Sequence, residues 1–145
     1  MQRLRKHGGY TIIELMIVTV IIGILGTIAL QRLGTVMRKS RDSATKGNLG
    51  SIRSALSIYY ADVLTQHPYE VGALTVNGRY LAEIPKTSLK EYHPDSMSVL
   101  NVSSPNGIDD AGGWAYNNDA TAPDYGNVWV NCTHTDGKGT AWSTY

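Results

Sequence analysis

The decisive stretch is residues 8–18, which read GGYTIIELMIV. A glycine pair, Gly8 and Gly9, ends a short basic leader, and an almost purely apolar run follows. Glu14 is the one charged residue between positions 10 and 30. As a helix, this run would span roughly 30 Å, which is the thickness of the hydrocarbon core of a bilayer. Because an unpaired carboxylate is costly in lipid, we expect Glu14 to have a partner or a function there.

This stretch resembles the processing site of type IV pilins and type II secretion pseudopilins. The matching positions are Gly9, Thr11, residues 13–18 and residues 21–25. In that family a prepilin peptidase cuts after the glycine. The resemblance therefore implies cleavage between Gly9 and Tyr10, N-methylation of Tyr10, and a role for Glu14 in assembly. Two positions depart from the usual pattern: Tyr10 stands where phenylalanine is commonest, and Gln31 stands where many pilins have a helix-kinking proline.

Residues 1–9 form the predicted leader peptide, which holds three of the 13 basic residues and no acid. Its positive charge places this end in the cytoplasm. Two alternatives are an ordinary signal peptide and a plain signal anchor. The apolar run is longer than a normal signal h-region and no clear small-residue cleavage site follows it, while a plain anchor explains neither Gly9 nor Glu14. Without the leader, ten basic residues face 12 acidic ones, a balance that indicates no nucleic-acid binding.

Residues 10–62 are predicted to form one long helix, with residues 10–30 in the membrane or in a filament core. No proline interrupts the chain before Pro68. Beyond the apolar run, apolar or small residues recur at three- and four-residue steps, which is typical of an amphipathic helix. This stripe consists of Leu33, Val36, Met37, Ser40, Ala44, Gly47, Ile52, Ala55, Leu56, Tyr59, Tyr60 and Val63. We expect its second half to pack against the rest of the chain.

Residues 63–145 are predicted to form a C-terminal globular head. Strand-like alternation occurs at residues 97–102, 113–117 and 128–132, with turn residues between them. This pattern predicts an antiparallel sheet that is polar on one side. Since about 80 residues make only a small core, the helix stripe has to complete it. The predicted fold class is α+β: a long N-terminal helix packed on a small C-terminal antiparallel sheet, which resembles the lollipop shape of pilins.

Cys132 is the one cysteine, so no disulfide can form within the chain, and we interpret it as a buried strand residue. Calcium is a candidate for holding the C-terminal segment, because the major pseudopilins that the chain resembles bind it in a C-terminal loop. The candidate ligands are Asn118, Asp119 and Asp124, whose oxygens suit this ion. The alternative is a polar turn, since Asn and Asp are also ordinary turn residues.

Cys132, His134 and Asp136 alternate along the chain, so a continued strand would direct all three to one side. Zinc favours such ligands but requires a fourth. His67 and His93 would join them only if the fold happened to bring them there, so the sequence predicts no metal site at this place. The chain also shows no nucleophile motif, phosphate-binding loop or recognisable pair of catalytic carboxylates. We therefore predict that the protein is not an enzyme.

The resemblance implies a structural subunit of a type IV pilus or pilus-like filament. Its partners would be copies of itself, the prepilin peptidase, an inner-membrane platform protein and an assembly ATPase. It would first be a single-pass inner-membrane protein and then part of a periplasmic or extracellular filament. The carboxylate of Glu14 would pair with the freed amine of a neighbouring Tyr10 and so set the axial register of the subunits.

Two other functions remain open. One is a pseudopilin of a type II secretion system that exports folded proteins. Residues 80–86, YLAEIPK, favour it because they are similar to a segment common in pseudopilins. The other is a membrane-anchored binding domain that never polymerises. Failed export in a knockout would favour the pseudopilin, and an intact phenotype after Glu14→Ala would favour the binding domain.

Overall fold

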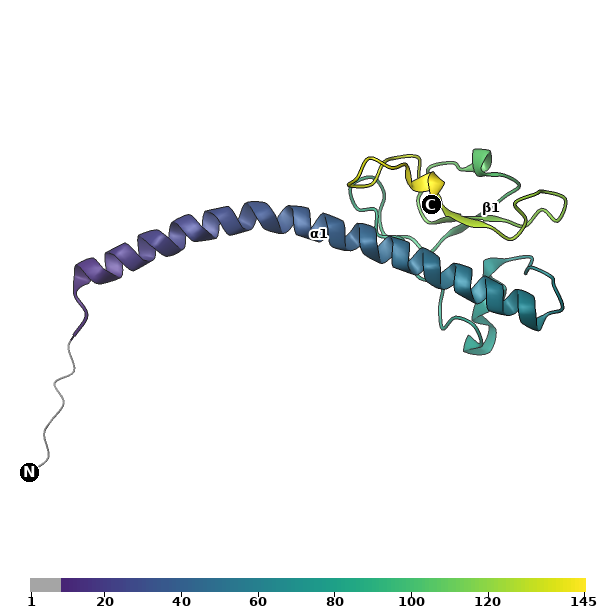
Figure 1. The fold of residues 1–145 in the computed structure, drawn as a ribbon, viewed down its shortest axis with the longest axis horizontal. Coiled ribbons are helices and arrows are strands. Elements are labelled where there is room, and N and C mark those ends of the chain that lie inside the picture. The colour runs from purple at the N-terminus through teal and green to yellow at the C-terminus, as the bar shows by residue number, and fades with distance from the viewer. Residues whose placement is uncertain (1–8) are drawn as a thin grey trace, which may run out of the picture. The chain divides into compact units, whose positions relative to one another are not determined.

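The structure is a computed structural model that describes residues 9–145 (Figure 1). Residues 1–8 of the predicted leader lie outside the described residues. Contacts divide the chain into an N-terminal unit that ends at Met37 and a second unit, Arg38–Tyr145, which we call the head unit. Each unit is considered by itself below.

The helix α1 extends from Ile12 to Asp62. Thr11 caps its start, since the Thr11 hydroxyl accepts a hydrogen bond of 3.3 Å from the backbone N–H of Glu14. The described part of the helix contains no proline. The helix ends where Leu64 and Thr65 take left-handed backbone angles, with φ of 54° and 68°. The helix therefore ends before it reaches Pro68, whose effect on the preceding residue would also have ended it.

Within the head unit, one face of α1 is buried in the core. Its buried residues are Thr45, Leu49, Ile52, Ala55 and Leu56, which follow three- and four-residue steps. Of the predicted stripe, Ile52, Ala55 and Leu56 are buried and Tyr59 packs against the core, but Tyr60 and Val63 are exposed. Ser40, Ala44 and Gly47 are exposed too, so the stripe was wrong at these positions of the head unit. Small residues such as alanine and glycine carry little information about which face of a helix is buried.

The sheet has three strands, β1 (Val99–Val102), β2 (Trp114–Asn117) and β3 (Val128–Val130), in the order β1-β2-β3. Strands β2 and β3 pair antiparallel, as predicted. Strands β1 and β2 pair parallel, so the prediction of a purely antiparallel sheet was wrong for this pair. The short 3₁₀ helix η2 (Pro105–Gly107) forms at the predicted turn, but the following loop returns the chain to the start of β1. Parallel pairing requires such a return.

The central strand β2 is buried on both faces, since Trp114, Ala115, Tyr116 and Asn117 are all buried. The expected polar face is therefore absent from this strand. Its large aromatic residues keep their polar ends paired, as buried Trp and Tyr side chains usually do. The Trp114 ring N–H donates to the carbonyl of Pro85 at 2.7 Å, and the Tyr116 hydroxyl donates to the carbonyl of Pro68 at 2.6 Å.

One hydrophobic core joins the buried face of α1 to the sheet. The 3₁₀ helix η1 (Val71–Gly78) contributes Val71 and Leu74, and the 3₁₀ helix η3 (Trp142–Thr144) contributes Trp142. The predicted fold class is thus confirmed as α+β, with a long N-terminal helix and a small C-terminal sheet. Cys132 is buried in this core as predicted, but it is not a strand residue, because β3 ends at Val130.

Candidate functional site

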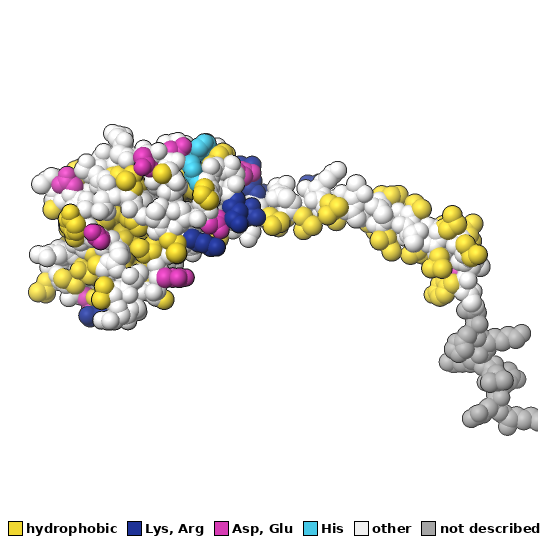
Figure 2. Space-filling view, turned by 180° about the vertical axis from the view of Figure 1, so that it is seen from behind, with side chains coloured by type: hydrophobic (Ala, Val, Ile, Leu, Met, Phe, Trp, Pro, Cys, Tyr) yellow, Lys and Arg dark blue, Asp and Glu magenta, His cyan; other side chains and the backbone are white. Residues whose placement is uncertain are grey.

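The N-terminal unit exposes an apolar helix surface. Figure 2 shows hydrophobic side chains along the length of its described part. Among residues 9–145, α1 is the one helix that is long and apolar enough to cross a membrane, judged by length and composition. None of its most apolar window is buried within the chain. A continuous apolar surface of this kind needs lipid or another protein to cover it.

The residues of the predicted processing and assembly site lie at the start of this unit. Tyr10 is 81% exposed and precedes the helix. Glu14 lies in the first turn of α1, where a carboxylate interacts favourably with the helix dipole. Gly9 is also exposed, and a Cβ added to it would meet no atom within 4 Å. The roles assigned to Gly9, Tyr10 and Glu14 stay predictions at this point.

Two of the three predicted calcium ligands, Asn118 and Asp119, make separate contacts. The Asn118 amide nitrogen donates to the carbonyl of Tyr69 at 3.3 Å. The carboxylate of Asp119 accepts hydrogen bonds from the backbone N–H and hydroxyl of Thr121 at 2.9 and 2.7 Å. These bonds lower the pKa of Asp119. Such contacts are typical of a polar turn, and calcium binding at Asn118, Asp119 and Asp124 stays a prediction.

Asp136 connects the C-terminal segment to α1. One of its carboxylate oxygens accepts hydrogen bonds from Lys46 at 2.5 Å and from the Tyr145 hydroxyl at 2.8 Å. The other accepts the backbone N–H groups of Lys138 at 2.8 Å and Thr140 at 3.0 Å. Burial alone would raise the pKa of Asp136, but these hydrogen bonds outweigh it and hold the pKa well below its usual range. Asp136 is therefore engaged by α1 and its own loop.

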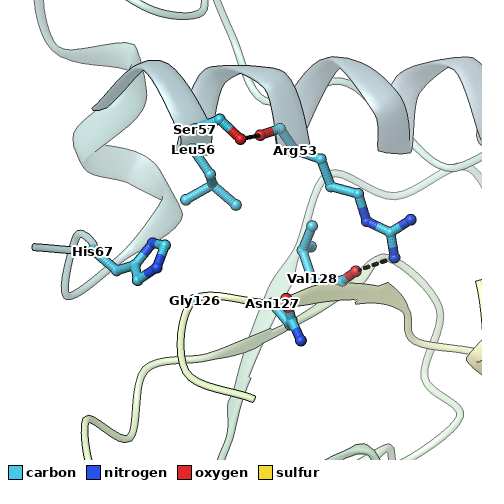
Figure 3. A pocket seen from close by; sticks show the side chains of 7 residues that line it. All are labelled: Arg53, Leu56, Ser57, His67, Gly126, Asn127 and Val128. Carbon is cyan, nitrogen blue, oxygen red and sulfur yellow. Dashed lines mark hydrogen bonds between the residues drawn. The ribbon is translucent and has the colours of Figure 1, made fainter. Parts of the chain in front are cut away.

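A hollow of about 260 Å³ lies between α1 and the loop that precedes β3 (Figure 3). Arg53 donates to the carbonyl of Val128 at 2.9 Å and to that of Tyr145. The Ser57 hydroxyl donates back to the carbonyl of Arg53 at 2.9 Å, so it is not directed at the His67 ring. Among the described residues, His67 Nδ1 is the one buried side-chain polar atom without a hydrogen-bond partner. Burial lowers the pKa of His67, which favours a neutral imidazole.

Four potential metal ligands meet at the surface of the head unit: His93, Asp110, Cys132 and His134. An oxygen of Asp110 lies 3.2 Å from His93 Nε2 and 3.4 Å from His134 Nδ1. The Cys132 sulfur lies 3.6 Å from the same nitrogen of His134. Burial raises the pKa of the Cys132 thiol to about 11. Figure 2 shows that histidine reaches the surface of this unit.

Sequence reasoning named Cys132, His134 and His93 but predicted no metal site at this place, and it did not connect Asp110 with them. The alternation of Cys132 and His134 is visible in the sequence, but Asp136, the third member of that pattern, turns to Lys46 instead. The strand ends at Val130, so alternation does not continue to position 136. His93 and Asp110 come from loops that are distant in the sequence, and no local spacing links them to Cys132.

The class that these features define is a pilin-like layout, in which a small α+β head follows an exposed apolar helix that is long enough to cross a membrane. The family comparison agrees, because residues 4–30 match the family described as the prokaryotic N-terminal methylation motif. The chain therefore carries the N-terminal segment of the prepilin-type family, and the resemblance to type IV pilins and type II secretion pseudopilins is confirmed.

Two curated relatives agree with this assignment. The chain is 40% identical over 79 residues to the fimbrial protein EcpC of Eikenella corrodens, an alignment that covers 52% of each chain. It is 36% identical over 62 residues to the type II secretion system core protein G of Pseudomonas aeruginosa, which covers 43% of each. The matched region thus spans about half the length of these relatives. No solved structure matches the chain.

Proposed function

We propose that this protein is a structural subunit of a type IV pilus or pilus-like filament. In this proposal a prepilin peptidase removes residues 1–9, the new N-terminus at Tyr10 is methylated, and α1 mediates polymerisation. The observation that carries the proposal is the exposed apolar surface of α1, much of which lies within the matched methylation motif, residues 4–30. A helix bundle in a filament would cover that surface once the helix leaves the membrane.

Glu14 is proposed to set the register between subunits. Near the membrane interface its carboxylate can remain close to water, because it lies in the first turn of α1. In a filament core it would be surrounded by apolar side chains and would need a positive partner. The amine that cleavage frees on Tyr10 of a neighbouring copy supplies that charge. Such a pair acts mainly through specificity, because desolvation offsets much of the attraction between the charges.

The partners of this subunit follow from the same proposal. They are further copies of the chain, the prepilin peptidase, an inner-membrane platform protein and an assembly ATPase. The subunit would be a single-pass protein of the inner membrane before assembly and part of a periplasmic or extracellular filament afterwards.

The second candidate is a pseudopilin of a type II secretion system. The similarity to a type II secretion core protein favours it, although that match is shorter and less identical than the match to the fimbrial protein. The two candidates share processing and polymerisation and differ in the machine they serve. Loss of surface fibres in a deletion strain supports the pilus, whereas failed export of folded enzymes with fibres intact supports the pseudopilin.

The test of the proposal is replacement of Glu14. Glu14→Gln keeps the shape and hydrogen bonding of the side chain but removes its charge. We expect both Glu14→Gln and Glu14→Ala to leave membrane insertion and leader cleavage nearly unchanged and to reduce filaments by at least tenfold in electron micrographs of sheared cells. Removing one partner of a buried ion pair costs roughly 3–5 kcal/mol, which is ample for such a loss.

Glu83→Gln is the matched control, because Glu83 is an exposed carboxylate of the head unit. Filaments should be as abundant in this variant as in the wild type. Regular, abundant filaments from Glu14→Gln would show that charge is not what the position requires. If neither the wild type nor the Glu14 variants form filaments and the cells behave alike, a membrane-anchored binding domain that does not polymerise would be favoured instead.

A further inference from the structure

We propose that His93, Asp110, Cys132 and His134 form a zinc-binding site in the head unit. The group is the one set of three or more His, Cys, Asp and Glu side chains in residues 9–145 whose ligand atoms gather closely enough to hold a metal ion. It stands apart from the N-terminal segment, so it does not depend on the proposed filament function.

The spacing of the four ligand atoms fits a tetrahedral ion. Zinc bonds of about 2.0–2.3 Å place neighbouring ligand atoms about 3.3–3.6 Å apart. Three of the pairs lie close to this spacing: His93–Asp110 at 3.2 Å, His134–Asp110 at 3.4 Å and Cys132–His134 at 3.6 Å. All four atoms lie within 4.8 Å of one another, so no pair has to close by more than about 1.5 Å. Small side-chain rotations supply a movement of that size.

The chemistry of the ligands selects zinc over calcium and magnesium. Two imidazoles, one carboxylate and one thiolate make a mixed nitrogen, oxygen and sulfur set, which zinc accepts in four-coordinate sites. Calcium requires six to eight oxygens and magnesium an octahedron of oxygens, which this cluster does not offer. The carboxylate of Asp110 and the thiolate of Cys132 would together balance the two positive charges of the ion.

The surroundings hold the ligands in place. The backbone N–H of Thr133 donates to the Asp110 carboxylate at 2.7 Å, and the Tyr92 ring stacks on His134 with 4.1 Å between ring centres. Gly112 allows the loop to approach His93, because a Cβ at this position would lie 2.9 Å from His93 Cβ. Outer contacts of this kind orient metal ligands and raise the affinity of a site.

The buried side-chain amide of Asn131 holds the loop between β1 and β2 beside the segment that follows β3. It donates to the Asp109 carboxylate at 2.7 Å and to the carbonyl of Gly112 at 3.2 Å. Asp110 therefore lies in a loop that is anchored beside the segment of Cys132. The side chain of His134 is 40% exposed, so an ion can enter from solvent on that side.

The proposed ion would crosslink three parts of the chain. His93 follows the turn that begins at Leu89, Asp110 lies in the loop between β1 and β2, and the other two ligands follow β3. With one cysteine, the chain cannot form an internal disulfide. Zinc would supply a crosslink in place of a disulfide and hold the segment after β3 against the rest of the head unit. Metal binding should therefore stabilise the fold.

The experiment uses the full chain, purified in detergent and stripped of metal with a chelator. Titration against a chromophoric zinc chelator measures stoichiometry and affinity, and tryptophan fluorescence follows melting of the head unit, which contains all three tryptophans. We expect one zinc ion per chain and a higher melting temperature with zinc. Cobalt(II) in its place should give the thiolate-to-metal charge-transfer absorption and the intense visible bands of a tetrahedral site.

Two variants remove ligands with little risk to folding. His134→Gln changes a partly exposed side chain, and Cys132→Ser keeps the size of a buried one. Each should weaken zinc binding at least tenfold, the loss that even a changed outer partner can cause, and Cys132→Ser should also abolish the charge-transfer band. Glu91→Gln, a carboxylate two residues from His93 that pairs with Arg38, is the control and should bind zinc like the wild type.

Three outcomes would overturn the proposal. The first is that the stripped wild type binds zinc no more tightly than His134→Gln and Cys132→Ser do. The second is that the cobalt-loaded chain shows no thiolate charge-transfer band, and the third is that zinc binds but leaves the melting temperature of the wild type unchanged, which would remove the crosslinking role.

Discussion

Asp136 accepts four hydrogen bonds, two on each carboxylate oxygen, and is almost completely buried. At the scale of single residues this is the contact that attaches the C-terminal segment to α1. A buried carboxylate is stabilising only while its partners remain, because desolvation of an unpaired charge is costly. The depressed pKa of Asp136 is the sign that its partners more than offset that cost.

We predict that Asp136→Asn lowers the free energy of unfolding at pH 7 by about 1–3 kcal/mol, the usual effect of leaving buried hydrogen-bonding groups without partners. The pKa of Asp136 is lower in the folded chain than the ordinary value of about 3.9. Its stabilisation is therefore fully present above that pH and is lost as the pH falls towards the folded pKa. The gap between wild type and variant should narrow below about pH 4 in urea unfolding followed by tryptophan fluorescence.

Asp62→Asn is the control for this prediction. Asp62 pairs with Arg79 at 3.0 Å, but both side chains are largely exposed, so its loss should cost less than about 1 kcal/mol. Equal losses in the two variants, or a gap for Asp136→Asn that stays constant down to pH 2, would refute the assigned role of Asp136.

At the scale of elements, the loop between β2 and β3 depends on one glycine. Gly126 has a φ of +83° and donates its N–H to the carbonyl of Asn117 at 2.9 Å, which closes the loop. A Cβ at this position would lie 2.4 Å from the His67 ring. Two separate effects thus exclude a side chain: the left-handed backbone and the closeness of the imidazole (Figure 3).

Gly126→Ala and Gly139→Ala separate these two effects. Gly139 has nearly the same φ, +84°, but a Cβ there would meet no atom within 4 Å. Gly139→Ala should therefore show only the backbone cost of about 1–2 kcal/mol. Gly126→Ala should lose a further 1–3 kcal/mol or so, the typical cost of overpacking. Denaturant unfolding of both variants measures the difference, and equal losses would mean that His67 moves aside freely.

At the scale of the whole molecule, the chain combines a helical segment with an exposed apolar surface and a separate folded unit. In the proposed function, cleavage after Gly9 converts the membrane precursor into a subunit that can join a filament. The structure imposes no need for glycine at this position, because Gly9 is exposed and has open space around it. A requirement for glycine there would have to come from the peptidase.

We predict that Gly9→Val blocks leader removal while the head unit folds normally. Intact mass spectrometry of membrane fractions should find a chain that retains residues 1–9, whereas the wild type should begin at methylated Tyr10. Gly23→Ala is the control, since Gly23 also has open space around it and lies beyond the cleavage site. A wild-type chain that begins at Gln31 or later would contradict the proposed processing.

The sequence predicted those elements that rest on local patterns. The run from Thr11 to Asp62 lacks proline and shows helical periodicity, so both ends of α1 could be placed closely. The strand pattern also located β2 and β3. The buried residues of α1 before Ile52 are Thr45 and Leu49, and the predicted stripe contained neither because it followed the small residues Ala44 and Gly47 instead. Thr45 is buried because its hydroxyl accepts the backbone N–H of Ser88 at 2.9 Å, a long-range contact.

The sequence alone determined the resemblance to the prepilin-type family and the N-terminal helix, because the methylation motif and the apolar run are contiguous and need no tertiary partner to be recognised. The tertiary structure decided the parallel pairing of β1 with β2, the attachment of Asp136 to Lys46, and the meeting of His93 and Asp110 with Cys132. These contacts join residues 15 to 90 positions apart. Loop paths set by the shared core bring them together, and no local periodicity encodes those paths.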